Sequence, residues 1–146
     1  WFTEETGNRI GRITPTGVIT EFSAGITASS NPRGITTGPD GNLWFSEYSG
    51  NRIGRITPSG VVTEFSTGIT ASSYPVGIIA ARDGNLWFTE NSANRVGTVT
   101  TSGVITEINL QDSDARPPAI TAGAEGNIWF SDPNTNQIGR CNVQLP

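Results

Sequence analysis

The sequence predicts an all-β fold built from a repeated four-stranded antiparallel unit, and three observations lead to this prediction. One aromatic tetrapeptide begins at residues 1, 44, 87 and 129, so its spacings are 43, 43 and 42 residues. The segments around it are short, rich in β-branched and aromatic residues, and separated by turns that contain Gly or Pro. Each copy contains adjacent large apolar residues, whose side chains point to opposite faces of the strand, so both faces are expected to be buried. These features are typical of a β-propeller, in which each repeat forms one blade.

The best-preserved repeat spans residues 32–69, and two turn signals divide it into strands. Asp40-Gly41 is a strong signal for a tight hairpin turn, and Pro58 to Gly60 marks a second turn. Trp44 and Phe45 are adjacent, so we expect their side chains to pack on the two neighbouring blades. The expected strands are residues 32–37, 43–47, 51–57 and 61–66.

Residues 1–146 are expected to form a single partial β-propeller of about three and a half blades. The first unit lacks its innermost strand and the last lacks its outermost strand, which indicates a piece of a longer protein. Closed propellers usually have four to eight complete blades, and uncovered blade faces would aggregate. We therefore expect the remaining blades of a longer chain, or copies of this chain, to close a ring. The units are a partial blade at 1–26, blades at 32–69 and 75–110, and a partial blade at 117–143.

Composition excludes some partners. The formal net charge of −4 argues against a nucleic-acid surface, which would need a basic stripe. No apolar run approaches the ~20 residues of a membrane span. The Lys-free, Ser/Thr/Gly-rich composition favours a secreted or cell-envelope location over the cytoplasm. Cys141 is expected to be a buried structural thiol, and the acidic linker 111–116 a solvated loop rather than a calcium site.

The repeat carries three motifs with a known pattern. Residues 38–47 read Gly-Pro-Asp-Gly-Asn-Leu-Trp-Phe-Ser-Glu, residues 51–58 read Asn-Arg-Ile-Gly-Arg-Ile-Thr-Pro, and residues 62–65 read Val-Thr-Glu-Phe. This pattern resembles the virginiamycin B lyase (streptogramin lyase) family over essentially the whole chain, and the NHL-repeat and gluconolactonase-like propellers more distantly. The resemblance implies a seven-bladed propeller whose enzymes open a cyclic depsipeptide by elimination, with Mg²⁺ and a histidine general base.

The resemblance also places the family's functional positions in this chain. The carboxylate positions are retained, but every position that would hold a histidine has another residue, because the chain contains no His. No catalytic residue and no metal ligand are therefore predicted, and Mg²⁺ is expected only if a parent protein has the lyase activity. The first histidine corresponds to Arg33, Val76 or Pro118, the second to Asn8, Asn51, Asn94 or Asn136, and the carboxylate to Glu4, Glu47, Glu90 or Asp132.

Candidate ligand-binding residues near the channel are of two kinds. Arg33 and Tyr74 differ from their equivalents in other repeats, and the Arg33 guanidinium could hold a carboxylate or phosphate. The strand-ending acids recur in every repeat, so a structural ion pair or hydrogen bond is the favoured interpretation for them, and Asn51 and Asn94 stand at the second histidine position. An ion-paired or solvated Arg33 is the alternative for the first kind. The candidates are Arg33, Glu47, Asn51, Tyr74, Glu90 and Asn94.

The recurring arginines, at positions 9 and 12 and at 52 and 55, are expected to form cross-strand ion pairs with the recurring Glu21, Glu64 and Glu107.

Three functions remain open. The first is a non-catalytic propeller scaffold or binding module, with a small molecule or glycan as ligand. The second is a fragment of a virginiamycin B lyase-like enzyme whose histidine-bearing blade is absent here. Lectin-like sugar binding ranks below both, because the Trp residues are expected to be used for packing.

Overall fold

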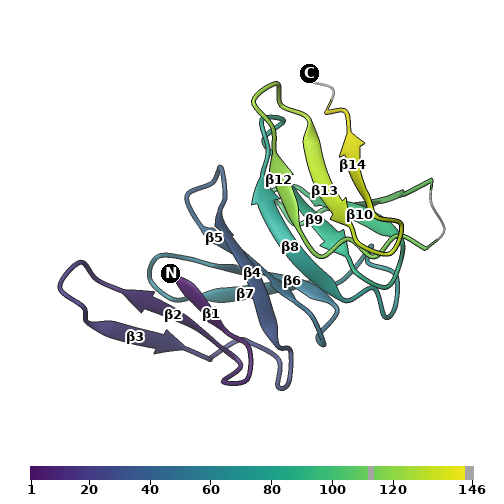
Figure 1. Cartoon of the computed structure of the whole chain (residues 1–146). Coiled ribbons are helices and arrows are strands. Elements are labelled where there is room, and N and C mark those ends of the chain that lie inside the picture. Colours follow the sequence, from purple (N-terminus) through teal and green to yellow (C-terminus); the bar gives the residue numbers. More distant parts are fainter. Residues whose placement is uncertain (112–113, 144–146) are drawn as a thin grey trace.

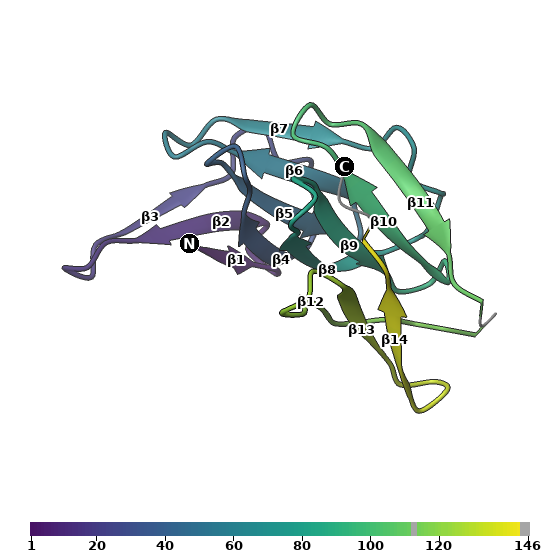
Figure 2. The same ribbon diagram turned by 90° about the horizontal axis from the view of Figure 1, so that it is seen from above.

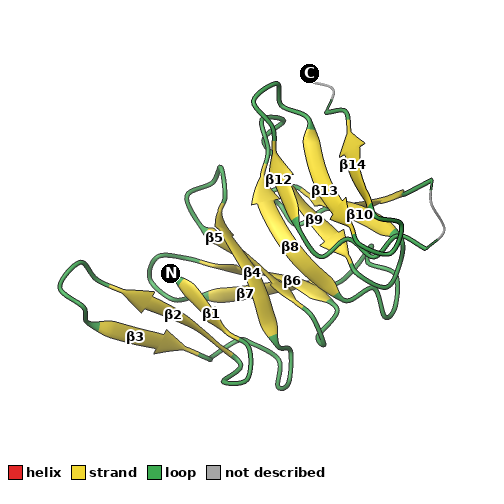
Figure 3. Ribbon diagram, viewed as in Figure 1, coloured by secondary structure: helices red, strands yellow, loops and turns green. Residues whose placement is uncertain are grey.

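The computed structural model describes residues 1–111 and 114–143. Within these ranges the chain is all-β, with fourteen strands in four antiparallel sheets and no helix (Figures 1 and 3). The sheets follow one another around a common centre, as Figure 2 shows from above. This arrangement confirms the predicted fold class, a series of β-propeller blades.

Each sheet runs from an inner strand to an outer strand in chain order. Sheet 1 contains β1 (Phe2–Glu4), β2 (Arg9–Ile13) and β3 (Ile19–Phe22). Sheet 2 contains β4 (Pro32–Thr37), β5 (Leu43–Glu47), β6 (Arg52–Ile56) and β7 (Val62–Phe65). Sheet 3 contains β8 (Pro75–Ala80), β9 (Leu86–Glu90), β10 (Arg95–Val99) and β11 (Ile105–Asn109). Sheet 4 contains β12 (Ile120–Ala122), β13 (Ile128–Asp132) and β14 (Gln137–Cys141).

The inner strands of sheets 2 and 3 lie close together near the centre. The β4–β5 pairing shifts register between Pro32 and Ile35, so the backbone bulges at Arg33 and Gly34. A Cβ atom at Gly34 would lie 2.5 Å from the carbonyl oxygen of Val76 on β8. Only a residue without a side chain allows this approach, which brings the beginnings of β4 and β8 to the same place.

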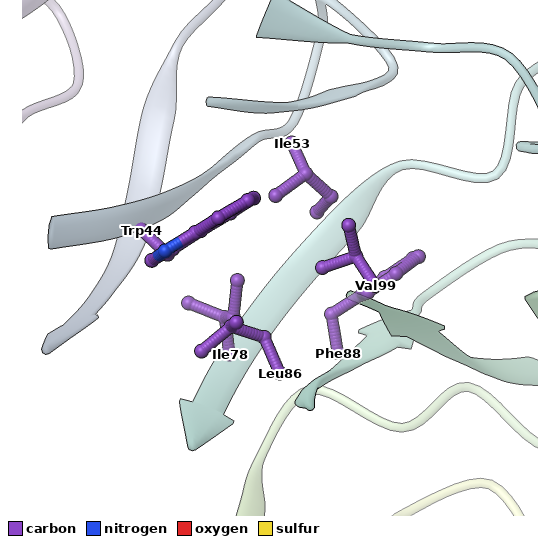
Figure 4. Packing of buried hydrophobic residues seen from close by; sticks show 6 residues of the cluster. All are labelled: Trp44, Ile53, Ile78, Leu86, Phe88 and Val99. Carbon is purple, nitrogen blue, oxygen red and sulfur yellow. The ribbon is translucent and has the colours of Figure 1, made fainter. Parts of the chain in front are cut away.

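Trp44 and Phe45 pack on opposite sides of sheet 2, as their adjacency predicts. Trp44 is fully buried against sheet 3, where it joins Ile78, Leu86 and Phe88 (Figure 4). Phe45 is fully buried on the other side, in a cluster with Ile10 of sheet 1. Both faces of a blade therefore form interfaces between sheets.

The Gly in the middle of β2, β6, β10 and β14 makes room for the aromatic ring of the neighbouring strand. Gly54 stands opposite Phe45 in the β5–β6 pairing, and a Cβ atom at Gly54 would lie 2.1 Å from the Phe45 ring. A larger residue would displace the ring that forms the blade interface. The other repeats contain the same pair, in Gly11–Phe2, Gly97–Phe88 and Gly139–Phe130.

The arginines that begin β2, β6 and β10 pair with the recurring glutamates, as predicted for Arg9 and Arg52. Arg9 pairs with Glu21, Arg52 Nε lies 3.7 Å from Glu64 Oε2, and Arg95 Nε lies 3.6 Å from Glu107 Oε2. These glutamates also hold the linker between sheets. Glu64, for example, accepts hydrogen bonds of 2.5 and 2.6 Å from the backbone N–H and hydroxyl of Thr27.

The prediction was wrong for the second arginine, which faces the other side of the sheet. The Arg55 guanidinium lies 5.6 Å from the Trp44 ring centroid and 5.5 Å from that of Phe65. Its Nη1 donates to the carbonyl of Thr101 in sheet 3, at 3.1 Å. Residues three apart on a strand point to opposite faces, so one glutamate cannot serve both arginines.

Three smaller expectations concern the remainder of the chain. Cys141 is a free, half-buried thiol packed beside the cluster between sheets 3 and 4, and burial raises its pKa. Residues 112 and 113 of the expected solvated loop lie outside the described residues. Across the described ranges we find no helix with the length and apolarity needed to cross a membrane.

Candidate functional site

Arg33 forms an ion pair between two sheets at the beginning of β4. Its Nε and Nη2 donate to Oε1 of Glu5, at 3.0 and 2.8 Å. Glu5 directly follows β1 of sheet 1, so this contact joins the inner ends of neighbouring blades. Both side chains remain partly exposed, which leaves the guanidinium accessible from solvent.

Two tyrosines extend this contact to a third sheet. The Arg33 Cζ atom lies 3.6 Å from the ring centroid of Tyr48, a cation–π distance. The Tyr48 ring packs on the Tyr74 ring, with centroids 4.9 Å apart and planes inclined by 34°. Tyr48 follows β5 and Tyr74 precedes β8. We call Glu5, Arg33, Tyr48 and Tyr74 the Arg33 cluster.

Tyr74 is held in a backbone conformation that few tyrosines adopt. Its φ is 54°, in the left-handed region that bulky residues avoid. Asn51 of the preceding sheet fixes this conformation, because its Oδ1 accepts from the backbone N–H groups of Ser73 and Tyr74 at 2.8 and 3.2 Å. The Asn51 Nδ2 donates to the carbonyl of Thr70 at 2.9 Å. Asn51 is therefore a residue that positions Tyr74 within the cluster.

Glu47 and Glu90 lie in a different environment, fully buried at the ends of β5 and β9. Burial raises the pKa of each carboxyl to about 7, and the neighbouring Glu64 or Glu107 adds to the rise. Arg52 and Arg95 act in the opposite direction. Neither side chain is accessible to a ligand in solvent.

The oxygens of Glu47 have little compensation for their burial. Ser30 lies close enough to favour the charged form, although its hydroxyl does not meet hydrogen-bond geometry with either oxygen. Among the described residues, neither Glu47 nor Glu90 has a hydrogen-bond partner for its carboxylate oxygens. Unpaired buried oxygens disfavour a negative charge, so the protonated acid is favoured near neutral pH.

Asn94 repeats the backbone conformation of Asn51 in sheet 3. Its φ is 61°, and its carbonyl accepts the backbone N–H of Leu110 at 3.0 Å. Its Oδ1 is buried and has no partner within residues 1–111 and 114–143. Of the six sequence candidates, the structure therefore links Arg33 and Tyr74 through the Tyr48 ring, with Asn51 supporting Tyr74. Glu47 pairs with Pro32 beside the cluster but is fully buried, and Glu90 and Asn94 stand at the equivalent positions of sheet 3.

Sequence reasoning missed Glu5 and Tyr48. These two residues occupy the same position in their repeats, directly after the acid that ends the second strand. The equivalents are Asn91 and Pro133, so this position differs in every repeat. The lack of repetition that identifies Arg33 and Tyr74 would have identified Glu5 and Tyr48 as well.

The donor groups of the cluster do not fit a magnesium site. Mg²⁺ prefers several oxygen ligands in octahedral geometry. The cluster contains one carboxylate, which is occupied by the Arg33 guanidinium. In the part of the chain that the structure describes, no three His, Cys, Asp or Glu residues come together as a metal site would require.

A comparison with protein families identifies the scaffold. The family described as virginiamycin B lyase matches residues 1–145. This chain belongs to the virginiamycin B lyase family. A streptogramin B lyase structure superposes with a TM-score of 0.90 and 42% identity, covering 99% of this chain and 47% of that chain. The virginiamycin B lyase of Staphylococcus aureus superposes with a TM-score of 0.87 and 45% identity, covering 100% and 52%.

The chain thus spans about half the length of the solved lyases that it matches. A catalytically inactive variant of the S. aureus lyase, with one histidine replaced by alanine, was solved with quinupristin. It is 39% identical, with a TM-score of 0.87 and coverages of 100% and 52%. A putative gluconolactonase at 19% identity, with a TM-score of 0.66 and coverages of 86% and 50%, shares the fold. No curated protein sequence matches the chain.

Proposed function

We propose that this chain is the ligand-holding, non-catalytic part of a streptogramin lyase-type propeller, and that the Arg33 cluster binds a streptogramin B-type cyclic peptide. The observation that carries the proposal is the convergence of four non-repeated side chains from three sheets. Repeated positions maintain the scaffold in every blade, whereas one ligand needs one set of contacts. The sequence identity with lyases, one of them solved with quinupristin, supports the choice of ligand class.

The cluster offers the two kinds of contact that a cyclic peptide needs. Glu5 uses the Nε–H and one Nη2–H of Arg33, which leaves three of the five guanidinium N–H groups for peptide carbonyls. The packed rings of Tyr48 and Tyr74 present an aromatic surface for apolar side chains. Because Glu5 and Tyr48 already hold the guanidinium, little side-chain freedom is lost on binding.

The chain itself is not expected to carry out the elimination. The sequence contains no His, which is the usual general base near neutral pH. Glu47 and Glu90 have pKa values of about 7, but they are buried and cannot reach a ligand proton. In the proposal, a histidine from outside this chain supplies the base, and no step passes through a metal ion.

Titration of the purified chain with quinupristin tests this function. We expect saturable binding by calorimetry, weakened about tenfold or more in Arg33→Ala and in Tyr74→Ala. Arg82→Ala is the matched control, because Arg82 is an exposed arginine in the β8–β9 turn and should leave the affinity unchanged. Affinity that survives both cluster substitutions, or ring-opened product detected by chromatography, would contradict the proposal. Sugar binding remains the lower-ranked alternative, and saturable glycan binding without quinupristin binding would favour it.

A further inference from the structure

Two buried acids, Glu47 and Glu90, lack the partners that a buried carboxylate needs. Each is 0% exposed, and within the described residues none of their four carboxyl oxygens has a hydrogen-bond partner. A Cβ atom at Gly50 would lie 2.8 Å from Glu47 Oε2 and 2.6 Å from Ser30 Oγ, so the acid lies close to the linker between sheets 1 and 2. An unpaired charge at such a place is costly, so the groups around the two acids decide their protonation.

In sheet 3 a second glutamate lies on the same face as Glu90. Glu90 stands opposite Arg95 in the β9–β10 pairing, and Glu107 stands opposite Gly97 in the β10–β11 pairing. Arg95 and Gly97 are two residues apart, so the arginine and both glutamates point to one face of the sheet. The Glu107 carboxyl lies within hydrogen-bonding reach of the Glu90 carboxyl, and Arg95 Nε lies 3.6 Å from Glu107 Oε2. The same arrangement in sheet 2 consists of Glu47, Glu64 and Arg52.

The charges around Glu90 balance when the two glutamates hold one proton. The elements around Glu90 contribute Arg95 from β10 and Glu107 from β11, whereas β8, the linker 68–73 and the loop 91–94 contain no charged residue. Two ionised carboxylates beside one guanidinium leave one negative charge uncompensated. Both carboxylates are also hydrogen-bond acceptors only, so they repel each other. One proton makes the group neutral and turns this contact into a charge-assisted hydrogen bond from Glu90 to Glu107.

The acid of sheet 4 is paired, and the linker beside it is different. The linkers before sheets 2 and 3 both contain Thr-Ala-Ser-Ser, whereas Ala115 stands at the position of Ser73 in the linker before sheet 4. The acid there is the shorter Asp132, whose Oδ1 accepts a backbone N–H at 3.4 Å and whose Oδ2 accepts the hydroxyl of Thr135 at 2.7 Å. The longer acid without a partner thus occurs together with the Thr-Ala-Ser-Ser linker.

Glu107 also holds the linker that carries Tyr74. Its carboxylate accepts the backbone N–H of Thr70 and, at 2.7 Å, the Thr70 hydroxyl. The same linker ends at Tyr74, whose backbone N–H is bound by Asn51. A displaced Glu107 would therefore release one end of the segment that places Tyr74 in the Arg33 cluster.

We propose that Glu90 and Glu107 share one proton, and that this proton keeps the linker 68–74 closed on sheet 3. Burial supports this assignment, because it raises the pKa of Glu90 to about 7, and the contact with Glu107 acts in the same direction. As the pH rises through this value, the proton leaves to solvent and the two carboxylates repel each other. Glu107 then moves away from Thr70, and the linker opens.

Each pair of acids acts on its own linker. Glu64, the partner of Glu47, holds the linker before sheet 2, and Glu107, the partner of Glu90, holds the linker before sheet 3. The chain thus contains two copies of one pH-dependent contact, and each copy is an internal control for the other. The consequence for Tyr74, and so for ligand affinity at the Arg33 cluster, rests on the proposed function, whereas the opening of the linker does not.

Hydrogen exchange of the two linkers, followed by mass spectrometry at pH 6 and pH 8, tests the shared proton. After correction for the intrinsic pH dependence of exchange, protection of both linkers should fall about tenfold in the parent chain, because pH 8 lies about one unit above the pKa of the buried acids. Glu90→Gln replaces the carboxyl by a neutral N–H donor, so the linker 68–74 should stay protected at pH 8 while the linker 25–31 still opens. Glu47→Gln is the matched control and should give the reverse result.

Two results would overturn the shared proton. The first is protection that does not change with pH in the parent chain. The second is a variant in which both linkers lose their pH response, because the change would then be global. Carboxyl ¹³C NMR of the glutamate-labelled chain measures the proton itself, and one of the resonances that titrate near pH 7 should disappear in Glu90→Gln. Persistence of all of them would place the proton elsewhere and contradict the proposal.

Quinupristin titration of the same samples separates this inference from the proposed function. Affinity that falls from pH 6 to pH 8 in the parent chain, but not in Glu90→Gln, would connect the linker to the Arg33 cluster. If the linkers open with rising pH and quinupristin binds at neither pH, the proposed function fails and the shared proton stands.

Discussion

The junction between sheets 2 and 3 and the Arg33 cluster both join neighbouring blades, yet they are built from opposite kinds of positions. The junction consists of buried apolar residues that recur in each repeat, such as Trp44 and Phe88. The cluster consists of partly exposed residues that differ between repeats, such as Arg33 and Tyr74. Repetition thus identifies the residues that stabilise the propeller, and departure from repetition identifies the residues of the proposed ligand site.

The largest effect is expected in the junction. Trp44→Ala should lower the free energy of unfolding by about 3–5 kcal/mol, because a fully buried aromatic side chain is lost and a cavity is left between sheets. Urea denaturation followed by circular dichroism measures this difference. Val104→Ala is the control, since Val104 is 62% exposed and its removal should change stability by less than about 0.5 kcal/mol. Equal midpoints for Trp44→Ala and the unsubstituted chain would show that the junction does not stabilise the fold.

The buried glutamates give the second effect, which depends on pH. The folded-state pKa of Glu47 and Glu90 is about 7, above the ordinary value of 4.5. Each group therefore contributes stability below about pH 4.5, and this contribution is lost as the pH rises through 7. We expect the free energy of unfolding to be about 2–3 kcal/mol per carboxyl lower at pH 8 than at pH 5.

Glu47→Gln separates this effect from the other carboxyl groups. The amide stays neutral, so the variant should be more stable than the parent at pH 8 and should lose about half of the difference between pH 5 and pH 8. Urea midpoints at the two pH values measure it, and Glu125→Gln, an exposed substitution in the β12–β13 turn, serves as control. Stability that rises from pH 5 to pH 8 in the parent chain would contradict the buried-acid interpretation.

The fold could be predicted from sequence because its interfaces repeat. The 43-residue spacing fixed the blades, and the adjacency of Trp44 and Phe45 showed that both faces of a sheet are covered. The position of Arg55 over two rings was not predicted, because the ion-pair interpretation ignored the alternation of side chains along β6. The burial of Glu47 follows from the same crowding of blades, which no short motif encodes.

Only Arg33 and Tyr74 of the Arg33 cluster were predicted from the sequence. Arg33 and Tyr74 differ from their equivalents, so comparison of repeats was sufficient to select them. Their contact with each other passes through Tyr48, and the bond that holds Tyr74 comes from Asn51, 23 residues earlier. Contacts of this kind depend on how closely β4 and β8 approach each other. The absence of a side chain at Gly34 permits this approach, but the local sequence does not reveal it.

Asn51 is a repeated residue that contacts the Arg33 cluster, so its substitution tests both regions at once. We expect it to have the smallest effect on the free energy of unfolding. Asn51→Ala removes two acceptor contacts and one donor contact, which should cost about 1–2 kcal/mol of unfolding free energy. Because the left-handed backbone of Tyr74 loses its support, quinupristin affinity should fall together with stability.

Asn51→Asp shows which contact positions the tyrosine. The aspartate keeps an oxygen for the N–H groups of Ser73 and Tyr74 but loses the N–H that binds the carbonyl of Thr70. It should therefore retain most of the affinity that Asn51→Ala loses, although part of the stability is still lost. If both variants bind the ligand like the parent chain, Tyr74 does not depend on Asn51. Asn51 would then stabilise only the fold, and binding by the Arg33 cluster would not depend on this repeated residue.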